Sequence, residues 1–256
     1  MTGAAVENRN EPARTCGLAE EVRSGDVRAV SRLITLLENG HPAGAEGLRL
    51  LCSDGHSSTI IGMTGYPGAG KSTLINALIR AYRARGRKVA VLAVDVSSAV
   101  TGGAILGDRI RMQEHALDSC VYIRSMATRG HRGGLAPTTE QAGRVLMAAG
   151  YDVVLIETVG VGQNELDVLK IAPTVVAVVA PGLGDEVQAM KAGLLEVAHI
   201  VVVNKVDHPE GESTVRDLRE WCPIVIGTVA TTGKGLPELL RAITAQQEDR
   251  NDTKGC

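Results

Sequence analysis

Apolar runs recur along most of the chain and alternate with stretches of helical periodicity. The runs predict seven strands, at 59–64, 88–94, 119–124, 152–157, 174–180, 199–204 and 223–228. Two of these runs contain no polar residue over 89–94 and 175–180, which is typical of strands buried on both faces of a parallel sheet. Helical patterns separate the strands, at 72–85, 108–117, 138–149, 164–171, 185–197, 212–221 and 236–246. This alternation predicts an α/β fold with a doubly wound, mostly parallel sheet.

The N-terminal part of the chain has a different pattern. Residues 1–15 are polar and are predicted to be disordered. Across 16–57 apolar residues recur at a spacing of about 3.6, with a break at Ser24-Gly25, which predicts a short helical extension. We expect the main domain to span 58–247 and a disordered tail to follow at 248–256.

Composition narrows the class of protein. The 256 residues are 44% hydrophobic but contain no Phe, so the core is expected to consist of Val, Leu, Ile and Ala. The net charge of −2 and the pI of about 6.3 give no indication of a nucleic-acid or anionic-membrane partner. Five scattered cysteines favour a reducing compartment, and the N-terminus lacks the apolar core of a signal peptide. We expect a cytoplasmic protein with no membrane and no nucleic-acid partner.

The turn between the first predicted strand and the next helix carries the clearest chemistry. Its sequence has the spacing G-x-x-x-x-G-K-[ST] of a phosphate-binding loop. Glycines let successive backbone N–H groups point at a phosphate, and the following helix adds its positive N-terminal end. Lys71 can reach the β- and γ-phosphates, and the Ser72 hydroxyl can bind Mg²⁺. The predicted nucleotide-binding residues of this loop are Gly65, Pro67, Gly68, Ala69, Gly70, Lys71, Ser72 and Thr73.

Acidic residues follow two other predicted strands. Asp95 ends the run at 88–94, and Asp108 lies in the glycine-rich segment after it. We expect a switch loop that brings both near the metal and the γ-phosphate, although a flexible loop with Asp108 capping the next helix is the alternative. Glu157 ends another strand, where an acidic residue can bind the far side of a nucleotide-bound Mg²⁺ directly or through water. Gly160 follows three residues later, where its N–H is expected to contact the γ-phosphate. The candidate catalytic residues are Lys71, Asp95, Asp108 and Glu157, and the candidate metal ligands are Ser72, Asp95, Asp108 and Glu157.

The end of the strand at 199–204 indicates which base is bound. There the chain reads Asn204-Lys205-Val206-Asp207. The carboxylate of Asp207 can accept hydrogen bonds from guanine N1–H and the 2-amino group, whereas adenine offers neither donor. Asn204 and Lys205 are expected to brace the loop and cover the ring. After the last strand, the backbone at Val229 and Ala230 supplies an N–H for guanine O6, or forms an ordinary loop. The predicted ligands are GTP or GDP with Mg²⁺.

Taken together, these motifs resemble those of the MeaB/ArgK (MMAA-type) family. Its members are G-protein chaperones of adenosylcobalamin-dependent acyl-CoA mutases, such as methylmalonyl-CoA mutase. The resemblance covers roughly residues 17–246. Glu157 stands where the common GTPase motif has Asp, and a Glu at this position is similar to the pattern of this family. It implies slow GTP hydrolysis that a partner stimulates, docking on a B₁₂-dependent mutase, and gating of cofactor loading and of the release of damaged cobalamin. It also implies mobile switches at 96–112, 158–163 and 182–191.

The chain departs from the family pattern at a few places. Val96 and Arg132 replace Pro and Leu, and Val229-Ala230 replaces Ser-Ala, which is tolerable because the O6 contact needs only a backbone N–H. The printed sequence ends about ten residues after its last predicted helix, at 236–246, and many relatives carry a C-terminal arm that pairs two subunits. This leaves formation of a homodimer open.

Three other functions share part of this chemistry. A nickel-insertion-type metallochaperone GTPase would need a His-rich or Cys/His metal site. A transport-system ATPase or kinase would need an acceptor and a preference for ATP, against which Asp207 argues. A binding module that uses GTP only to set its shape would need no catalysis. The sequence does not identify the client mutase.

Overall fold

The computed structural model describes residues 11–51, 58–95, 113–128, 135–136, 138–158, 167–182, 195 and 198–254. The chain divides into two compact units. A helical unit comprises 1–58 and 138–151, and a sheet unit comprises 59–137 and 152–256. Each unit is described by itself below.

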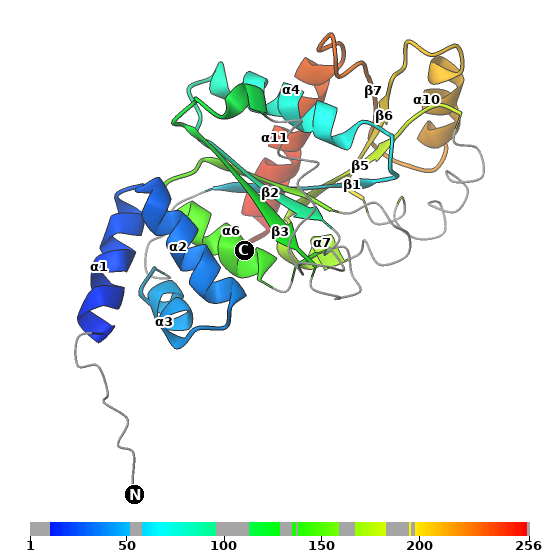
Figure 1. Cartoon of the computed structure of the whole chain (residues 1–256). Coiled ribbons are helices and arrows are strands. Elements are labelled where there is room, and N and C mark those ends of the chain that lie inside the picture. The colour runs from blue at the N-terminus through cyan, green and yellow to red at the C-terminus, as the bar shows by residue number, and fades with distance from the viewer. Residues whose placement is uncertain are drawn as a thin grey trace, which may run out of the picture. The chain divides into compact units, whose positions relative to one another are not determined.

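The helical unit joins the N-terminal helices to one helix from the middle of the chain. Its helices are α1 (Glu11–Arg23), α2 (Val27–Glu38), α3 (Pro42–Leu51) and α6 (Thr139–Ala148), all in mutual contact (Figure 1). The Asp26 side chain caps α2 by accepting from the Ala29 N–H at 2.7 Å. The sequence prediction placed the helix at 138–149 in the main domain, whereas the structure groups it with the N-terminal helices, because α6 buries an apolar face that includes Val145 and Leu146.

Both terminal helices are longer than predicted. Helix α1 begins at Glu11, inside the segment 1–15 that was predicted to be disordered, and Pro12 is tolerated because it lies in the first turn. Helix α11 (Leu236–Lys254) continues into the predicted tail 248–256. Its second half is polar, but it begins with Ala, Gln, Gln and Glu at 245–248, which are all good helix formers. Polarity alone therefore did not mark the helix end. Residues 1–10, 255 and 256 lie outside the described residues.

The described residues of the sheet unit form a seven-stranded sheet with the order β3-β2-β4-β1-β5-β6-β7. The strands are β1 (Thr59–Gly65), β2 (Val89–Asp95), β3 (Val121–Ala127), β4 (Val153–Glu157), β5 (Thr174–Val179), β6 (Ile200–Asn204) and β7 (Val225–Thr228). Every strand pair is parallel. Strands β4, β5 and β6 are buried along their whole length, as their uninterrupted apolar sequences predict. The predicted fold class is confirmed.

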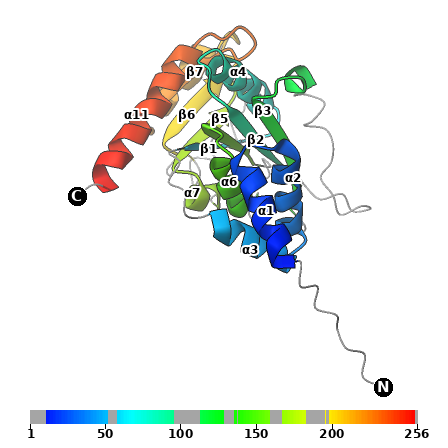
Figure 2. The same ribbon diagram turned by 90° about the vertical axis from the view of Figure 1, so that its left-hand side faces the viewer.

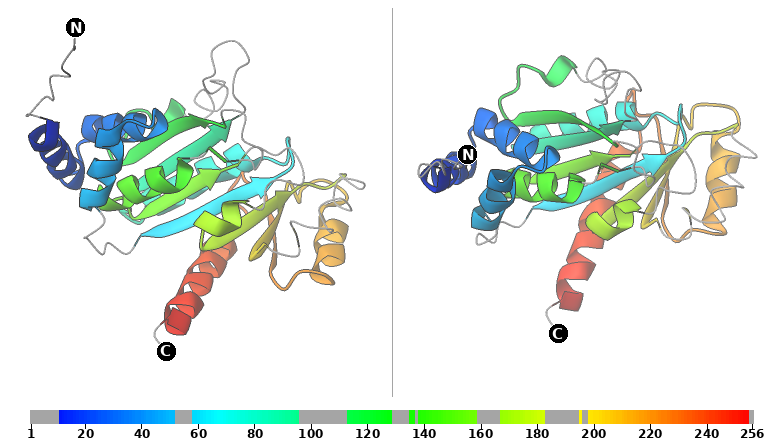
Figure 3. Two further views of the ribbon diagram at one scale, coloured as in Figure 1. Left: turned by 90° about the horizontal axis from the view of Figure 1, so that it is seen from below. Right: turned by 60° about the horizontal axis from the view of Figure 1, so that its bottom comes forward.

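Helices cover both faces of the sheet. Helix α4 (Lys71–Arg83) and α11 share one apolar cluster with alternate strand residues such as Met63, Val91 and Val178. Helix α7 (Val168–Ile171) lies on the opposite side of β1, where Val168 faces Gly62 (Figure 2). Helix α10 (Gly211–Arg219) lies beside β6 and β7 (Figure 3). No described helix is both long enough and apolar enough to cross a membrane.

Two helices predicted from the sequence lie largely outside the described residues. Of the helix at 108–117, the structure describes only a short 3₁₀ turn, η1 (Gln113–His115), and the residues after it. Of the helix at 185–197, it describes only Leu195, which is helical and buried.

Strand register brings the polar strand ends together. Met63 on β1 pairs with Glu157 on β4, so the chain leaves β1 for the phosphate loop directly beside the end of β4. Asn204 and Thr228 pair at the ends of β6 and β7. In parallel sheets of this kind ligands bind at the carboxyl ends of the strands, and those predicted phosphate- and base-binding residues that the structure describes lie at that edge.

Candidate functional site

The phosphate loop connects β1 to α4 and is held by its own lysine. The Lys71 ammonium donates to the Gly65 carbonyl at 2.6 Å and to the Tyr66 carbonyl at 3.1 Å, although its side chain is buried. Gly70 has φ +93° and precedes the first residue of α4, and no side chain caps that helix end. Helix N-termini without a side-chain cap are common anion sites, and phosphate binding at the start of α4 stays a prediction.

Gly65 has a conformation that only glycine adopts readily. Its φ is +130°, and a Cβ atom built on it would overlap the Val178 carbonyl oxygen on neighbouring β5. Gly68 also has positive φ, at +81°, but a Cβ there would meet no atom within 4 Å. A side chain at Gly68 would therefore meet only an unfavourable backbone conformation, whereas a side chain at Gly65 would also clash with the sheet.

We expect Gly65→Ala to lower the free energy of unfolding by about 2–3 kcal/mol, because strained backbone and steric overlap add. Gly68→Ala is the matched control and should cost about 1 kcal/mol, since only the left-handed conformation is disfavoured. Denaturant unfolding of both variants without nucleotide measures the difference. If both variants lose the same free energy of unfolding, the close approach of Gly65 to β5 is not what excludes a side chain at this position.

Two buried side chains with oxygen atoms, Ser72 and Glu157, lie next to the loop. The Ser72 hydroxyl donates to Glu157 Oε1 at 2.8 Å, and both side chains are less than a tenth exposed. A hydroxyl and a carboxylate at one point are the hard oxygen ligands that Mg²⁺ prefers, so these two residues fit that metal. The strand register explains their proximity, because β4 lies directly beside β1.

The structure gives only a partial account of the other acidic candidates. Asp95 is the last residue of β2 and pairs with Ala127 on β3, but its side chain is not described. Asp108 and Gly160 lie outside the described residues. So do most of the three predicted switches, of which only 158 and 182 are described. Their roles stay predictions.

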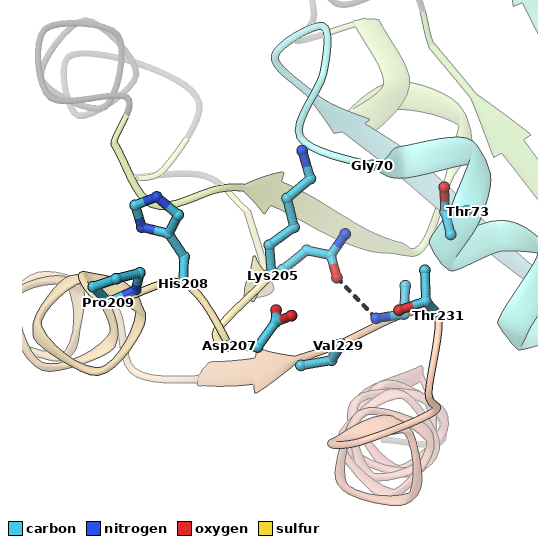
Figure 4. Close-up of a pocket in the computed structure, with 10 residues that line it drawn as sticks. Gly70, Thr73, Lys205, Asp207, His208, Pro209, Val229 and Thr231 are labelled. Carbon is cyan, nitrogen blue, oxygen red and sulfur yellow. Dashed lines mark hydrogen bonds between the residues drawn. The ribbon is translucent and has the colours of Figure 1, made fainter.

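A pocket of about 490 Å³ opens beside the phosphate loop. It is lined by Gly70, Thr73, Asn204, Lys205, Asp207, His208, Pro209, Val229, Ala230 and Thr231. The lining residues thus come from the phosphate loop, the β6–α10 connection and the loop after β7. Figure 4 shows the Asp207 carboxylate directed into the space between Lys205 and Thr231. Asp207 is exposed at this pocket, so its carboxylate can accept hydrogen bonds from a ligand there, and its role toward guanine stays a prediction.

Asn204 joins the three loops around this pocket. Its amide nitrogen donates to the Ala69 carbonyl at 3.0 Å, in the phosphate loop. Its Oδ1 accepts from the Ala230 N–H at 3.0 Å, the dashed contact in Figure 4, and from the Thr228 hydroxyl at 3.2 Å. The predicted bracing role of Asn204 therefore has a specific geometry. Guanine O6 would share the Ala230 N–H with Asn204, so that contact stays a prediction.

Lys205 ties the base-side loop to the phosphate loop a second time. Its ammonium donates to the Gly68 carbonyl at 2.8 Å. Among the described residues other than glycine it alone has a positive φ, at +61°. Left-handed backbone at a non-glycine residue is disfavoured and is found preferentially at functional sites.

Several lining residues were not singled out from the sequence. His208, Pro209 and Thr231 line the pocket, and Thr228 bonds Asn204. The available signal was their position, because each lies at the end of, or just after, the two strands that carry the base-binding residues. Choosing among such neighbours requires side-chain directions, which the linear pattern does not give.

Comparison with solved structures defines the class. A crystal structure described as an LAO/AO transport system kinase is similar with a TM-score of 0.72 and 26% identity, covering 98% of this chain and 79% of that one. The hydrogenase maturation factor HypB from Archaeoglobus fulgidus shares the fold, with a TM-score of 0.56, 21% identity and coverage of 91% and 98%. With its phosphate-loop sequence after the first strand of a parallel sheet, the chain is a P-loop GTPase.

Sequence comparison then defines the family. The model "Methylmalonyl Co-A mutase-associated GTPase MeaB" matches residues 30–255, and the chain belongs to this family. GTPase ArgK of Escherichia coli is 37% identical over 247 residues, which are 88% of this chain and 75% of that protein. A Pyrococcus abyssi protein whose name assigns it to the GTPases is 50% identical over 244 residues, with coverage of 90% and 75%. The mouse protein "Methylmalonic aciduria type A homolog, mitochondrial" is 36% identical, with coverage of 84% and 59%. The resemblance stated from the sequence is confirmed.

Proposed function

We propose that this GTPase is a chaperone of an adenosylcobalamin-dependent acyl-CoA mutase, methylmalonyl-CoA mutase or a close relative. It docks on the mutase and uses GTP binding and hydrolysis to gate cofactor loading, protection and reactivation. The observation that carries this proposal is the match of a mutase-associated family model to residues 30–255, and the pocket lined by Asn204, Lys205 and Asp207 supports the nucleotide part of it. We also propose that the protein is cytoplasmic and that it can form a homodimer.

We propose a role for residues of the pocket and of the phosphate loop toward each part of GTP. Asp207 accepts from the guanine edge, and the aliphatic stem of Lys205 covers one face of the ring. The N–H groups at the start of α4 bind the phosphates, and Lys71 exchanges its two carbonyl acceptors for the β- and γ-phosphate oxygens. Catalysis then consists of positioning and of stabilising the charge that develops on the transferred group.

The metal proposal rests on Ser72 and Glu157. These side chains would hold Mg²⁺, which when bound supplies positive charge next to the phosphate oxygens. Asp95 and Asp108 are proposed to complete the acidic surroundings, and the Gly160 N–H to contact the γ-phosphate. Slow hydrolysis by the isolated protein follows from this proposal if the groups that position water become ordered only on the mutase.

The proposal predicts that a purified B₁₂-dependent acyl-CoA mutase raises the GTP turnover of the pure protein by at least about tenfold, because docking completes the catalytic site. Phosphate release is measured with and without the mutase, with ATP in place of GTP as the nucleotide control. ATP should support little turnover, since adenine leaves the Asp207 carboxylate without donors.

Two outcomes would contradict this assignment. GTP turnover that no B₁₂-dependent mutase stimulates would retain the GTPase and reject the mutase as its partner. Efficient phosphate transfer from ATP to a binding protein would replace the chaperone with a kinase. An unrelated protein that binds no cobalamin, added at the same concentration as the mutase, serves as the matched control. It separates specific docking from general stabilisation of the GTPase.

A further inference from the structure

A buried chain of hydrogen bonds runs from the end of β7 to the phosphate loop. The Thr228 hydroxyl donates to Asn204 Oδ1 at 3.2 Å, and Asn204 Nδ2 donates to the Ala69 carbonyl at 3.0 Å. Thr228 is fully buried and Asn204 is 3% exposed. Thr228 is not among the residues that line the pocket, whereas its partner Asn204 is, so the hydroxyl can influence a ligand there through Asn204.

The direction of these bonds fixes how the Asn204 carboxamide lies. A carboxamide has an acceptor end and a donor end, and rotating it by 180° exchanges them. Here the acceptor end faces two donors, the Thr228 hydroxyl and the Ala230 N–H, while the donor end faces a carbonyl oxygen. For a side chain as buried as Asn204, unmatched ends cost far more than they would in solvent. Thr228 therefore contributes to holding the donor end of Asn204 toward Ala69.

We infer that Thr228 is a positioning residue for guanine nucleotide binding. Its hydroxyl orients Asn204, and Asn204 sets the distance between the phosphate loop at Ala69 and the base-side loop at Ala230. A nucleotide that contacts both loops binds tightly only when this separation is correct. The inference rests on the nucleotide binding in the proposed function and is independent of the mutase.

The test measures the Kd of a fluorescent GDP analogue for the full chain and its variants, with Mg²⁺ present. Thr228→Val removes the hydroxyl but keeps the β-branched shape that suits a strand. We expect it to weaken binding by about tenfold, the order expected when one buried hydrogen bond is lost. Thr228→Ser keeps the hydroxyl and should recover most of the affinity. Thr244→Val is the matched control, because the Thr244 hydroxyl bonds only within α11, to the Leu240 carbonyl.

A double-mutant cycle separates positioning from general stability. If Thr228 acts through Asn204, Thr228→Val should add little further loss in an Asn204→Ala background. Full additivity, or wild-type affinity in Thr228→Val, would overturn the inference. Thermal unfolding without nucleotide shows whether each variant is folded, and Thr228→Ala replaces Thr228→Val if the latter is not. Failure of the wild-type protein to bind GDP would reject the nucleotide site itself, whereas absence of a mutase effect has no bearing here.

Discussion

Asp207→Asn is expected to weaken GTP binding by about 100-fold and to transfer the preference to xanthosine triphosphate. In the proposed site the Asp207 carboxylate accepts from both N1–H and the 2-amino group, and bonds to a charged acceptor are worth about 1.5–3 kcal/mol each. An asparagine offers one acceptor and places an N–H₂ group against the 2-amino group. Xanthine carries a carbonyl at that position, so its edge matches the asparagine amide.

The measurement compares the Kd values of GTP, xanthosine triphosphate and ATP for the wild-type protein and the variant. Asp217→Asn makes the same chemical change at an exposed position of α10 and should leave all three values unchanged. Loss of GTP binding without a gain for xanthosine triphosphate would indicate a damaged pocket. Unchanged discrimination between GTP and ATP would show that Asp207 does not select the base.

The sheet and the phosphate loop could be predicted because their signals are local. The continuous apolar runs marked each strand to within about three residues, since strands buried on both faces have no polar alternation to blur their limits. The spacing of Gly65, Gly70 and Lys71 fixed the loop, because both flanking elements were recognisable. The Asn204-Lys205-Val206-Asp207 motif led to three residues that line the pocket, namely Asn204, Lys205 and Asp207.

What the sequence did not reveal depends on contacts between distant segments. The periodicity of 138–149 predicted helix α6 correctly, but it could not show that this helix packs with α1, α2 and α3. Likewise Thr228 is an ordinary strand residue in the sequence. Its bond to Asn204 follows only from the register of β7 against β6. Helical periodicity identifies an apolar face without identifying what covers it.

Lys71→Ala is expected to lower GTP turnover by about 10²–10³-fold, the loss typical when one preorganised donor to a developing charge is removed. In the structure the ammonium is buried and already bonds two loop carbonyls, so the substitution also removes a support of the loop that receives the phosphates. Both effects should appear in kcat and in KM. Lys71→Met separates them in part, because methionine retains the apolar stem without the charge. Lys88→Ala, which removes an exposed cation outside the pocket, is the control.

The same variant distinguishes a catalytic switch from a binding module. Single-turnover hydrolysis and protection of the mutase against loss of cofactor are measured in parallel, with and without GTP. If hydrolysis drives gating, Lys71→Ala should lose release of damaged cobalamin together with turnover, because the nucleotide state no longer changes. If protection and release both persist while hydrolysis is lost, GTP serves only to set the shape of the protein. Turnover within tenfold of wild type would instead show that another group carries the charge assigned to Lys71, and the phosphate assignment would have to move to a cation outside this loop.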